Sequence, residues 1–184
     1  RFYRLTDFQY FSVDEAILYL SAKKIFVEAK PILLAPNTNL GISLGAFFIY
    51  ISAFIFWVVK SNLILVLAFW SLLGVISSFL MYKTGKLLFN TRMGLIASFL
   101  YSSSFLLSLF DRRWWALSLD SFLVILAIFS LRKILDKKYQ YGFFLFFAAS
   151  FAWHSDPSLL VISVAIFLSF LLFKLPIFKK QYLP

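Results

Sequence analysis

Long apolar runs alternate with short polar connections along most of this chain. The runs cover residues 41–59, 62–82, 93–110, 117–131, 141–153 and 157–173. A helix needs about 20 apolar residues to cross the hydrocarbon core of a bilayer, with a range near 17–25. The runs 117–131 and 141–153 are short by this measure, and we expect them to extend into their polar flanks. The pattern predicts an all-α integral membrane protein, a polytopic helical bundle.

Residues 1–40 have ordinary polarity and predict a different kind of helix. Ser12-Val13-Asp14-Glu15 precedes a segment in which apolar positions recur at helical spacing: Leu18, Ala22, Ile25, Phe26 and Ala29. This spacing predicts an amphipathic helix of about four turns, suited to lying on a membrane surface. Pro31, Pro36 and the Asn37-Thr38-Asn39 cluster predict its end and a turn.

The composition excludes several classes of protein. Hydrophobic residues make up 62% of the 184 residues and charged residues 14%, whereas a soluble domain has about 45–50% and about 25%. Soluble enzymes, nucleic-acid-binding proteins and disordered tails are therefore excluded. The net charge of +10 is spread between the apolar runs, so it indicates membrane topology and no nucleic-acid partner. The chain has no Cys and one His, which excludes thiolate chemistry and a multi-His metal site.

The distribution of basic residues predicts which connections face the cytoplasm. Residues 83–92, 132–138 and 174–180 carry three, four and three Lys or Arg, whereas 111–116 carries two and 153–157 none. The positive-inside rule places the first three connections in the cytoplasm and the other two outside. The side occupied by residues 1–40 stays open, because it depends on whether 41–59 spans the membrane. The five Lys or Arg of residues 1–40 favour a spanning segment and a cytoplasmic position.

The pair Asp14-Glu15 is the first candidate for chemistry. Adjacent carboxylates at a helix start can serve as a general base and as an organiser of a metal or a donor phosphate. The alternative is structural: Ser12-x-x-Glu15 is a capping-box pattern, and Asp14 would favour the positive end of the helix dipole. The two roles are compatible.

Asp111-Arg112-Arg113-Trp114-Trp115 is the second candidate. Two guanidinium groups beside two indoles at a membrane boundary suit the phosphate of a lipid carrier and its sugar or isoprenoid. The alternative is an interfacial aromatic belt with arginines that reach the headgroups. Asp120 lies inside an apolar run, where a carboxylate is costly and indicates a functional site, with Arg112 and Arg113 as its expected partners.

The third candidate is His154-Ser155-Asp156-Pro157, which predicts a tight external turn. His154 could carry a proton or bind a donor phosphate. Alternatively, Asp156 caps a helix that begins at Pro157.

Taken together, these motifs and their order resemble the GT-C glycosyltransferases. The matching stretches are SVDEAILYLSAKKIF, YKTGKLLFNTRMGLIASFLYSSS, DRRWWALSLDSFLVILAIF and FAWHSDPSLL. They are most similar to the bacterial membrane enzymes of the protein O-mannosyltransferase and aminoarabinose transferase-like superfamily. The individual motifs are short, and their order carries the resemblance.

The resemblance implies a topology and a set of roles. Residues 1–40 would form an external acidic loop with the amphipathic helix, 41–59 a juxtamembrane helix, and 62–184 the transmembrane bundle. Asp14 would be the general base, with Glu15 beside it. Arg112 or Arg113 would stabilise the leaving lipid phosphate, and Asp111 or Asp120 would supply the acidic position of the same loop. Members of the family differ in their need for a divalent metal, so a metal stays possible.

The expected function is therefore that of a multi-pass enzyme of the cell membrane with its site facing the exterior. It would move a sugar from a polyprenyl-phosphate donor to a lipid, protein or glycan acceptor. We also expect the chain, which runs from Arg1 to Pro184, to be a fragment truncated at both ends and inactive alone. The alternatives are a transporter or flippase fragment and a non-enzymatic membrane scaffold.

Overall fold

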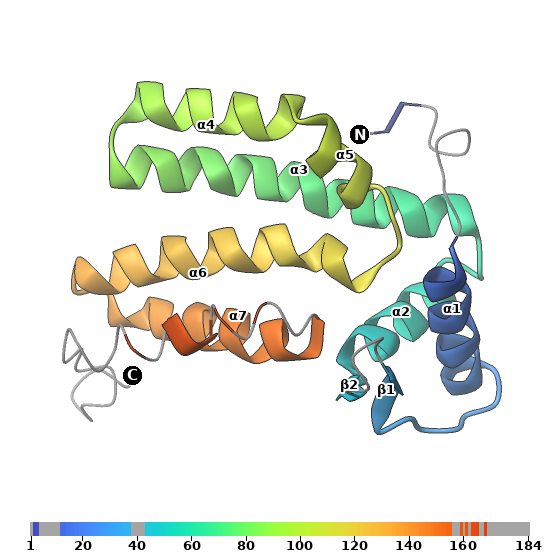
Figure 1. Ribbon diagram of the computed structural model, residues 1–184. Coiled ribbons are helices and arrows are strands. Elements are labelled where there is room, and N and C mark those ends of the chain that lie inside the picture. The colour runs from blue at the N-terminus through green and yellow to red at the C-terminus, as the bar shows by residue number, and fades with distance from the viewer. Residues whose placement is uncertain are drawn as a thin grey trace.

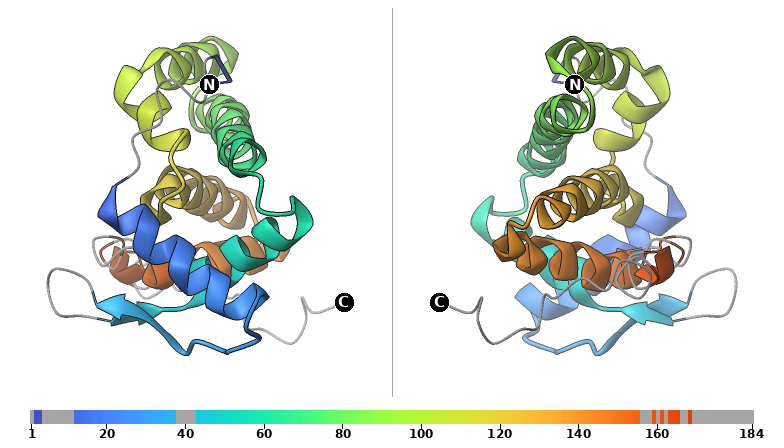
Figure 2. Two further views of the ribbon diagram at one scale, coloured as in Figure 1. Left: turned by 90° about the vertical axis from the view of Figure 1, so that its right-hand side faces the viewer. Right: turned by 90° about the vertical axis from the view of Figure 1, so that its left-hand side faces the viewer.

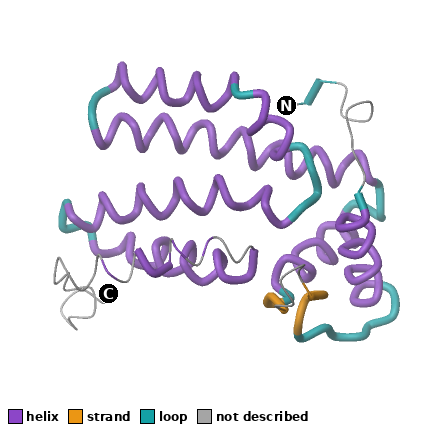
Figure 3. The backbone as a smooth tube through the Cα atoms, in the orientation of Figure 1, coloured by secondary structure: helices purple, strands orange, loops and turns teal. Residues whose placement is uncertain are grey.

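The protein is mostly helical (Figures 1 and 3). The computed structural model describes residues 2–3, 12–37, 43–155, 159, 161, 163–165 and 168. The elements in this part are α1 (Val13–Phe26), β1 (Leu34–Asn37), β2 (Ser43–Gly45), α2 (Phe47–Val58), α3 (Leu63–Leu88), α4 (Thr91–Ser103), α5 (Phe105–Asp111), the 3-10 turn η1 (Ala116–Leu119), α6 (Asp120–Leu135), the 3-10 turn η2 (Tyr139–Tyr141) and α7 (Gly142–Ser155).

Short polar residues fix where the apolar helices begin. The side chains of Asn62 and Asn90 accept hydrogen bonds from backbone N–H groups in the first turns of α3 and α4, and Ser104 does the same for α5. These caps satisfy amide donors that have no partner within the helix. Lys60 and Ser61 both have positive φ angles, which ends α2 sharply before α3 begins.

Four helices form a row in the order α4, α3, α6, α7 (Figure 1). The α3–α4 pair approaches most closely near its turn, where a Cβ atom at Gly85 would lie 2.8 Å from the Cα of Gly94. Glycine at both positions lets the two backbones pack together. The α3–α4 and α6–α7 connections lie at the same end of the row (Figure 1).

The remaining elements lie beside the other ends of these four helices, away from the α3–α4 and α6–α7 connections (Figures 1 and 2). Helix α1 packs on α2, and α2 and β2 contact α7. Strands β1 and β2 pair antiparallel, with Leu34 opposite Gly45 and Asn37 opposite Ser43. The sequence analysis predicted a turn at Pro36 and no strands, so this small sheet was missed.

The apolar face of α1 is covered by the protein itself. Ala22 is fully buried, and Leu18, Ile25 and Phe26 pack against a core cluster built from α2 and the start of α3. A helix is thus present where it was predicted, but its apolar stripe faces α2 and is not available to a membrane surface. Its other face also exposes apolar side chains, those of Val13, Ile17 and Leu20. Ala29, the last position of the predicted stripe, lies beyond the helix with a φ of 52°.

One helix in the described part of the chain is long and apolar enough to cross a membrane. It is α3, with 26 residues. The predicted run 93–110 is broken into α4 and α5, which are bent by 68° and count as a second span only if taken together. Helix α2 starts at Phe47 because β2 occupies the beginning of the run 41–59, and its 12 residues leave it short.

The two short runs extend into their C-terminal polar flanks as expected, but the helices begin after the first residues of the runs. Helix α6 reaches Leu135 and has 16 residues, and α7 reaches Ser155 and has 14. Both are still shorter than the usual transmembrane helix. Most of the run 157–173 lies outside the described residues.

Candidate functional site

The start of α1 and the loop after α5 meet in an ion pair between Glu15 and Arg113. The Nη2 atom of Arg113 lies 2.6 Å from Glu15 Oε1, and its Nε donates a hydrogen bond to the same oxygen at 2.8 Å. The Glu15 side chain is fully buried, and that of Arg113 is 15% exposed. Two of the predicted site residues, 98 positions apart in the sequence, are therefore brought together.

The second oxygen of the Glu15 carboxylate is held by Ser12. The backbone N–H of Ser12 donates to Glu15 Oε2 at 2.7 Å, and the Ser12 hydroxyl donates to the same oxygen. Ser12 and Glu15 thus form the predicted capping box. The Nη2 atom of Arg113 also donates to the Ser12 hydroxyl at 3.3 Å. Both carboxylate oxygens of Glu15 are satisfied, so its geometry is that of a structural anchor.

Asp14 differs from Glu15 in being exposed. It lies in the first turn of α1 and immediately precedes Glu15, the acidic member of the buried ion pair, in the sequence. Within the part of the chain that the structure describes, no hydrogen bond or ion pair occupies its carboxylate. Of the two acidic residues, Asp14 is the one whose oxygens are open to a substrate.

The two arginines of the loop have different surroundings. Arg112 is half-buried, and its Nη2 donates to the backbone carbonyl of Tyr3 at 2.8 Å. The guanidinium of Arg113 lies 4.6 Å from the ring centre of Trp115, on which it stacks in addition to binding Glu15. Arg113 thus binds a carboxylate and an aromatic ring, and Arg112 binds a backbone carbonyl.

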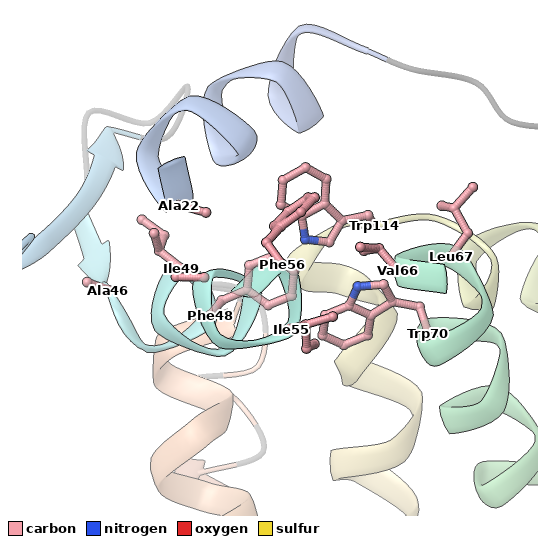
Figure 4. Close-up of a cluster of buried hydrophobic side chains, with 11 residues drawn as sticks. Ala22, Ala46, Phe48, Ile49, Ile55, Phe56, Val66, Leu67, Trp70 and Trp114 are labelled. Atoms are coloured by element: carbon pink, nitrogen blue, oxygen red, sulfur yellow. The ribbon is translucent and has the colours of Figure 1, made fainter. Parts of the chain in front are cut away.

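Trp114 anchors this loop in the core at the end of the row. Its side chain is completely buried, and its ring packs edge-on against Phe56 of α2 with centroids 4.6 Å apart (Figure 4). Its indole N–H donates to the Ser52 hydroxyl at 2.9 Å. The tryptophans were predicted to be a sugar platform or a membrane-interface belt. Trp114 is neither, because α1 and α2 enclose it.

The two remaining acidic candidates are on helices. Asp111 is the last residue of α5, is 2% exposed, and accepts hydrogen bonds from the Tyr101 hydroxyl at 3.4 Å to each oxygen. Asp120 is half-buried and is the first residue of α6. Its carboxylate therefore lies at the helix N-terminus, where a negative charge is stabilised by the helix dipole.

His154 lies in a different environment. It belongs to α7 and not to the predicted turn, and the rest of that motif, Asp156 and Pro157, lies outside the described residues. Its ring packs beside Phe47 and Phe151 and directly against Gly45. Its contacts are thus with β2, α2 and α7. They give it no role in the network of Glu15 and Arg113.

The donor set does not fit a resident divalent metal. No group of three or more acidic or imidazole side chains gathers in the described residues. Both oxygens of Glu15 are bound by Arg113 and Ser12, so the acidic pair offers only the Asp14 carboxylate to a cation. One carboxylate holds Mg²⁺ only where waters and substrate phosphates supply the other oxygen ligands. The described residues therefore contain no preformed site for a divalent metal.

Comparison with known proteins adds no assignment. No family model, curated protein or solved structure matches the chain.

The sequence analysis missed three residues that shape the site. Ser52 accepts from Trp114, Tyr101 donates to Asp111, and Gly74 of α3 packs against Asp111. Gly74 did carry a signal, since a lone glycine inside a helix costs about 1 kcal/mol relative to alanine and indicates close packing. A serine or tyrosine in an apolar run carries no comparable signal.

Proposed function

We propose that the protein is a multi-pass membrane glycosyltransferase of the GT-C type. It transfers a sugar from a polyprenyl-phosphate donor to a hydroxyl-bearing acceptor at the outer face of the membrane. The observation that carries this proposal is the Glu15–Arg113 ion pair. The pair joins the acidic start of α1 to residues 112–115 between α5 and η1, which we call the arginine loop. An exposed carboxylate and two guanidinium groups therefore share one end of the helical row.

The surface of the row supports a membrane location. Many large apolar side chains of α3 and α4 are exposed, among them Phe79 at 59% and Phe99 at 70%. Contiguous exposed apolar surface of this kind indicates contact with lipid or with other proteins. The short helices α6 and α7 cross the bilayer in this proposal because the local bilayer thins around them and their flanking basic side chains reach the headgroups.

The distribution of charge supports the orientation. The connections between α3 and α4 and between α6 and α7 lie at the end opposite α1 (Figure 1). These connections and the helix turns beside them carry Lys83, Lys86, Arg92, Arg132, Lys133, Lys137 and Lys138. Compared with the loop that carries Arg112 and Arg113, the positive-inside rule assigns this end to the cytoplasm, although Lys23, Lys24, Lys30 and Lys60 add positive charge to the α1 end. The α1 end, with Asp14 and the arginine loop, then faces outward, which requires that α2 does not span the membrane.

The proposed reaction is a direct displacement at the anomeric carbon. Asp14 accepts the proton of the acceptor hydroxyl as its oxygen bonds to that carbon. The bond between the carbon and the phosphate oxygen breaks, and polyprenyl phosphate leaves with the electron pair. Arg112 stabilises the negative charge that develops on the phosphate, while Arg113, bound to Glu15, holds α1 against the loop.

The test compares Asp14→Asn with wild type in membranes from cells that express the full-length protein. Membranes are supplied with polyprenyl-phosphate-linked sugars, and release of polyprenyl phosphate is measured. Loss of a general base lowers the rate by about 10²–10⁴-fold. Glu28→Gln is the matched control, because Glu28 lies just beyond the same helix and pairs with the exposed Lys30. Full turnover by Asp14→Asn refutes the assignment of the base.

A transporter or flippase is the second candidate, and one observation favours it. Transporters often use discontinuous helices at the substrate site, and the break of 68° between α4 and α5 is close to the buried Asp111. The two functions differ in bond chemistry. In proteoliposomes, a flippase moves the lipid-linked sugar across the bilayer intact, whereas a transferase cleaves it.

A further inference from the structure

The carboxylate of Asp111 is buried among α3, α4 and α5, away from any open surface. It is 2% exposed, and the hydroxyl of Tyr101 donates to both of its oxygens at 3.4 Å. A substrate phosphate or sugar has no access to a side chain in this position. The burial argues against the role in substrate binding that the sequence suggested for Asp111.

Gly74 of α3 provides the space that Asp111 occupies. A Cβ atom at position 74 would lie 2.6 Å from Asp111 Oδ2 and 2.7 Å from its Cβ. Real Cβ atoms do not come this close to other heavy atoms. Rotation of the Asp111 side chain does not relieve the contact, because its own Cβ is one of the atoms that collide. Glycine at 74 is therefore required by Asp111, although it costs about 1 kcal/mol in a helix interior.

The arginine loop starts at the residue after this contact. Arg112 and Arg113 follow Asp111 directly, and the Ser118 hydroxyl contacts the carbonyl oxygens of Phe110 and Arg113 at 2.9 and 2.7 Å, closing the loop on itself. Trp114 fixes its other side in the core. The loop is therefore held at two points, and the contact between Asp111 and Gly74 determines where it begins.

We propose that Asp111 is a positioning residue that holds the arginine loop in register with α1 by seating its side chain against Gly74. The seat keeps Arg113 within reach of Glu15 and presents Arg112 toward the substrate. The effect on turnover rests on the proposed glycosyltransferase function. The effect on the position of the loop does not depend on that function, and it can be measured without any substrate.

Limited trypsin digestion of the full-length protein in detergent measures the loop position. Trypsin cleaves after Arg112 and Arg113, and the seated loop resists cleavage because the Arg113 side chain is 15% exposed. Gly74→Ala displaces Asp111, and cleavage at these two bonds accelerates at least about tenfold as the open population grows. Wild type cleaved at the same rate as Gly74→Ala overturns the proposal.

Two further variants separate this effect from general destabilisation. Gly85→Ala is the matched control, since it crowds Gly94 at the other end of α3, and it leaves the loop protected. Asp111→Asn has the same shape and still accepts from Tyr101, so it also leaves the loop protected. If Gly85→Ala exposes the loop as much as Gly74→Ala does, or if Asp111→Asn exposes it fully, the proposal that packing of Asp111 against Gly74 positions the loop is wrong.

Steady-state kinetics test whether the contact between Asp111 and Gly74 affects catalysis. Gly74→Ala lowers kcat for donor consumption more than it raises KM, because the displaced arginine acts on charge that develops in the transition state. An unchanged kcat in a protein with an exposed loop overturns the link to catalysis. If wild type itself consumes no donor, the proposed function fails, and the trypsin result still decides the role of Asp111.

Discussion

Arg113 reaches across 98 positions of sequence to a carboxylate, Glu15, that is completely buried. Taking two charges out of water costs several kcal/mol per ion, and the pair is stable because hydrogen bonds satisfy both carboxylate oxygens. The pair connects the first helix to the loop after the fifth. It therefore holds the N-terminal elements against the end of the helical row.

Removal of one member of this pair should destabilise the fold strongly. Glu15→Gln leaves the guanidinium of Arg113 without its counter-charge, at a cost of about 3–5 kcal/mol. Thermal unfolding in detergent measures the change. Asp136→Asn is the control, because its ion pair with Arg132 is a partly exposed i,i+4 contact worth about 0.3–0.5 kcal/mol. Equal stabilities of the two variants would contradict a structural role for the buried pair.

The hydrogen bond between Trp114 and Ser52 gives a second prediction. Ser52→Ala leaves a buried indole N–H without an acceptor, which costs about 1–3 kcal/mol. Ser103→Ala is the control, since its hydroxyl is exposed and binds carbonyls of its own helix. Unfolding by denaturant should separate the two variants. Ser52→Ala as stable as Ser103→Ala would show that Trp114 does not depend on this contact.

The contact between Gly45 and His154 gives a third prediction. A Cβ atom at position 45 would overlap the imidazole ring, so Gly45→Ala should destabilise the packing of β2 on α7 by about 1–3 kcal/mol. Replacing His154 with alanine removes the obstacle. The double variant Gly45→Ala/His154→Ala should then be no less stable than His154→Ala alone. A cost of Gly45→Ala that persists in the double variant has another origin.

The local features of the site could be predicted from sequence. The capping box of Ser12 and Glu15 is a short pattern with a defined geometry, and the structure contains it. Its ion pair with Arg113 could not be foreseen, because two adjacent arginines were equally good candidates and the contact joins distant segments. The structure distinguishes them by their partners: Arg113 binds Glu15, and Arg112 binds a backbone carbonyl.

The breaks between helices were harder to predict than the helices. The run 93–110 is apolar throughout and was predicted as one segment, yet Ser104 caps a new helix and bends the chain. A single serine competes for backbone hydrogen bonds too weakly to mark a break in advance. Strand β1 contains Pro36, which favours a turn, and proline is tolerated there because a two-stranded sheet consists of edges.

The side of the membrane that each end of the row faces tests the proposal most directly. The chain has no cysteine, so single cysteines at Val13 and Phe89, which are 74% and 72% exposed, can be probed in intact cells with a membrane-impermeant thiol reagent. We predict that Val13→Cys in the full-length protein reacts from outside and that Phe89→Cys reacts only after lysis. If Val13→Cys is protected until lysis, or if both positions react from the same side, the proposed external site of Asp14 and the arginine loop is wrong.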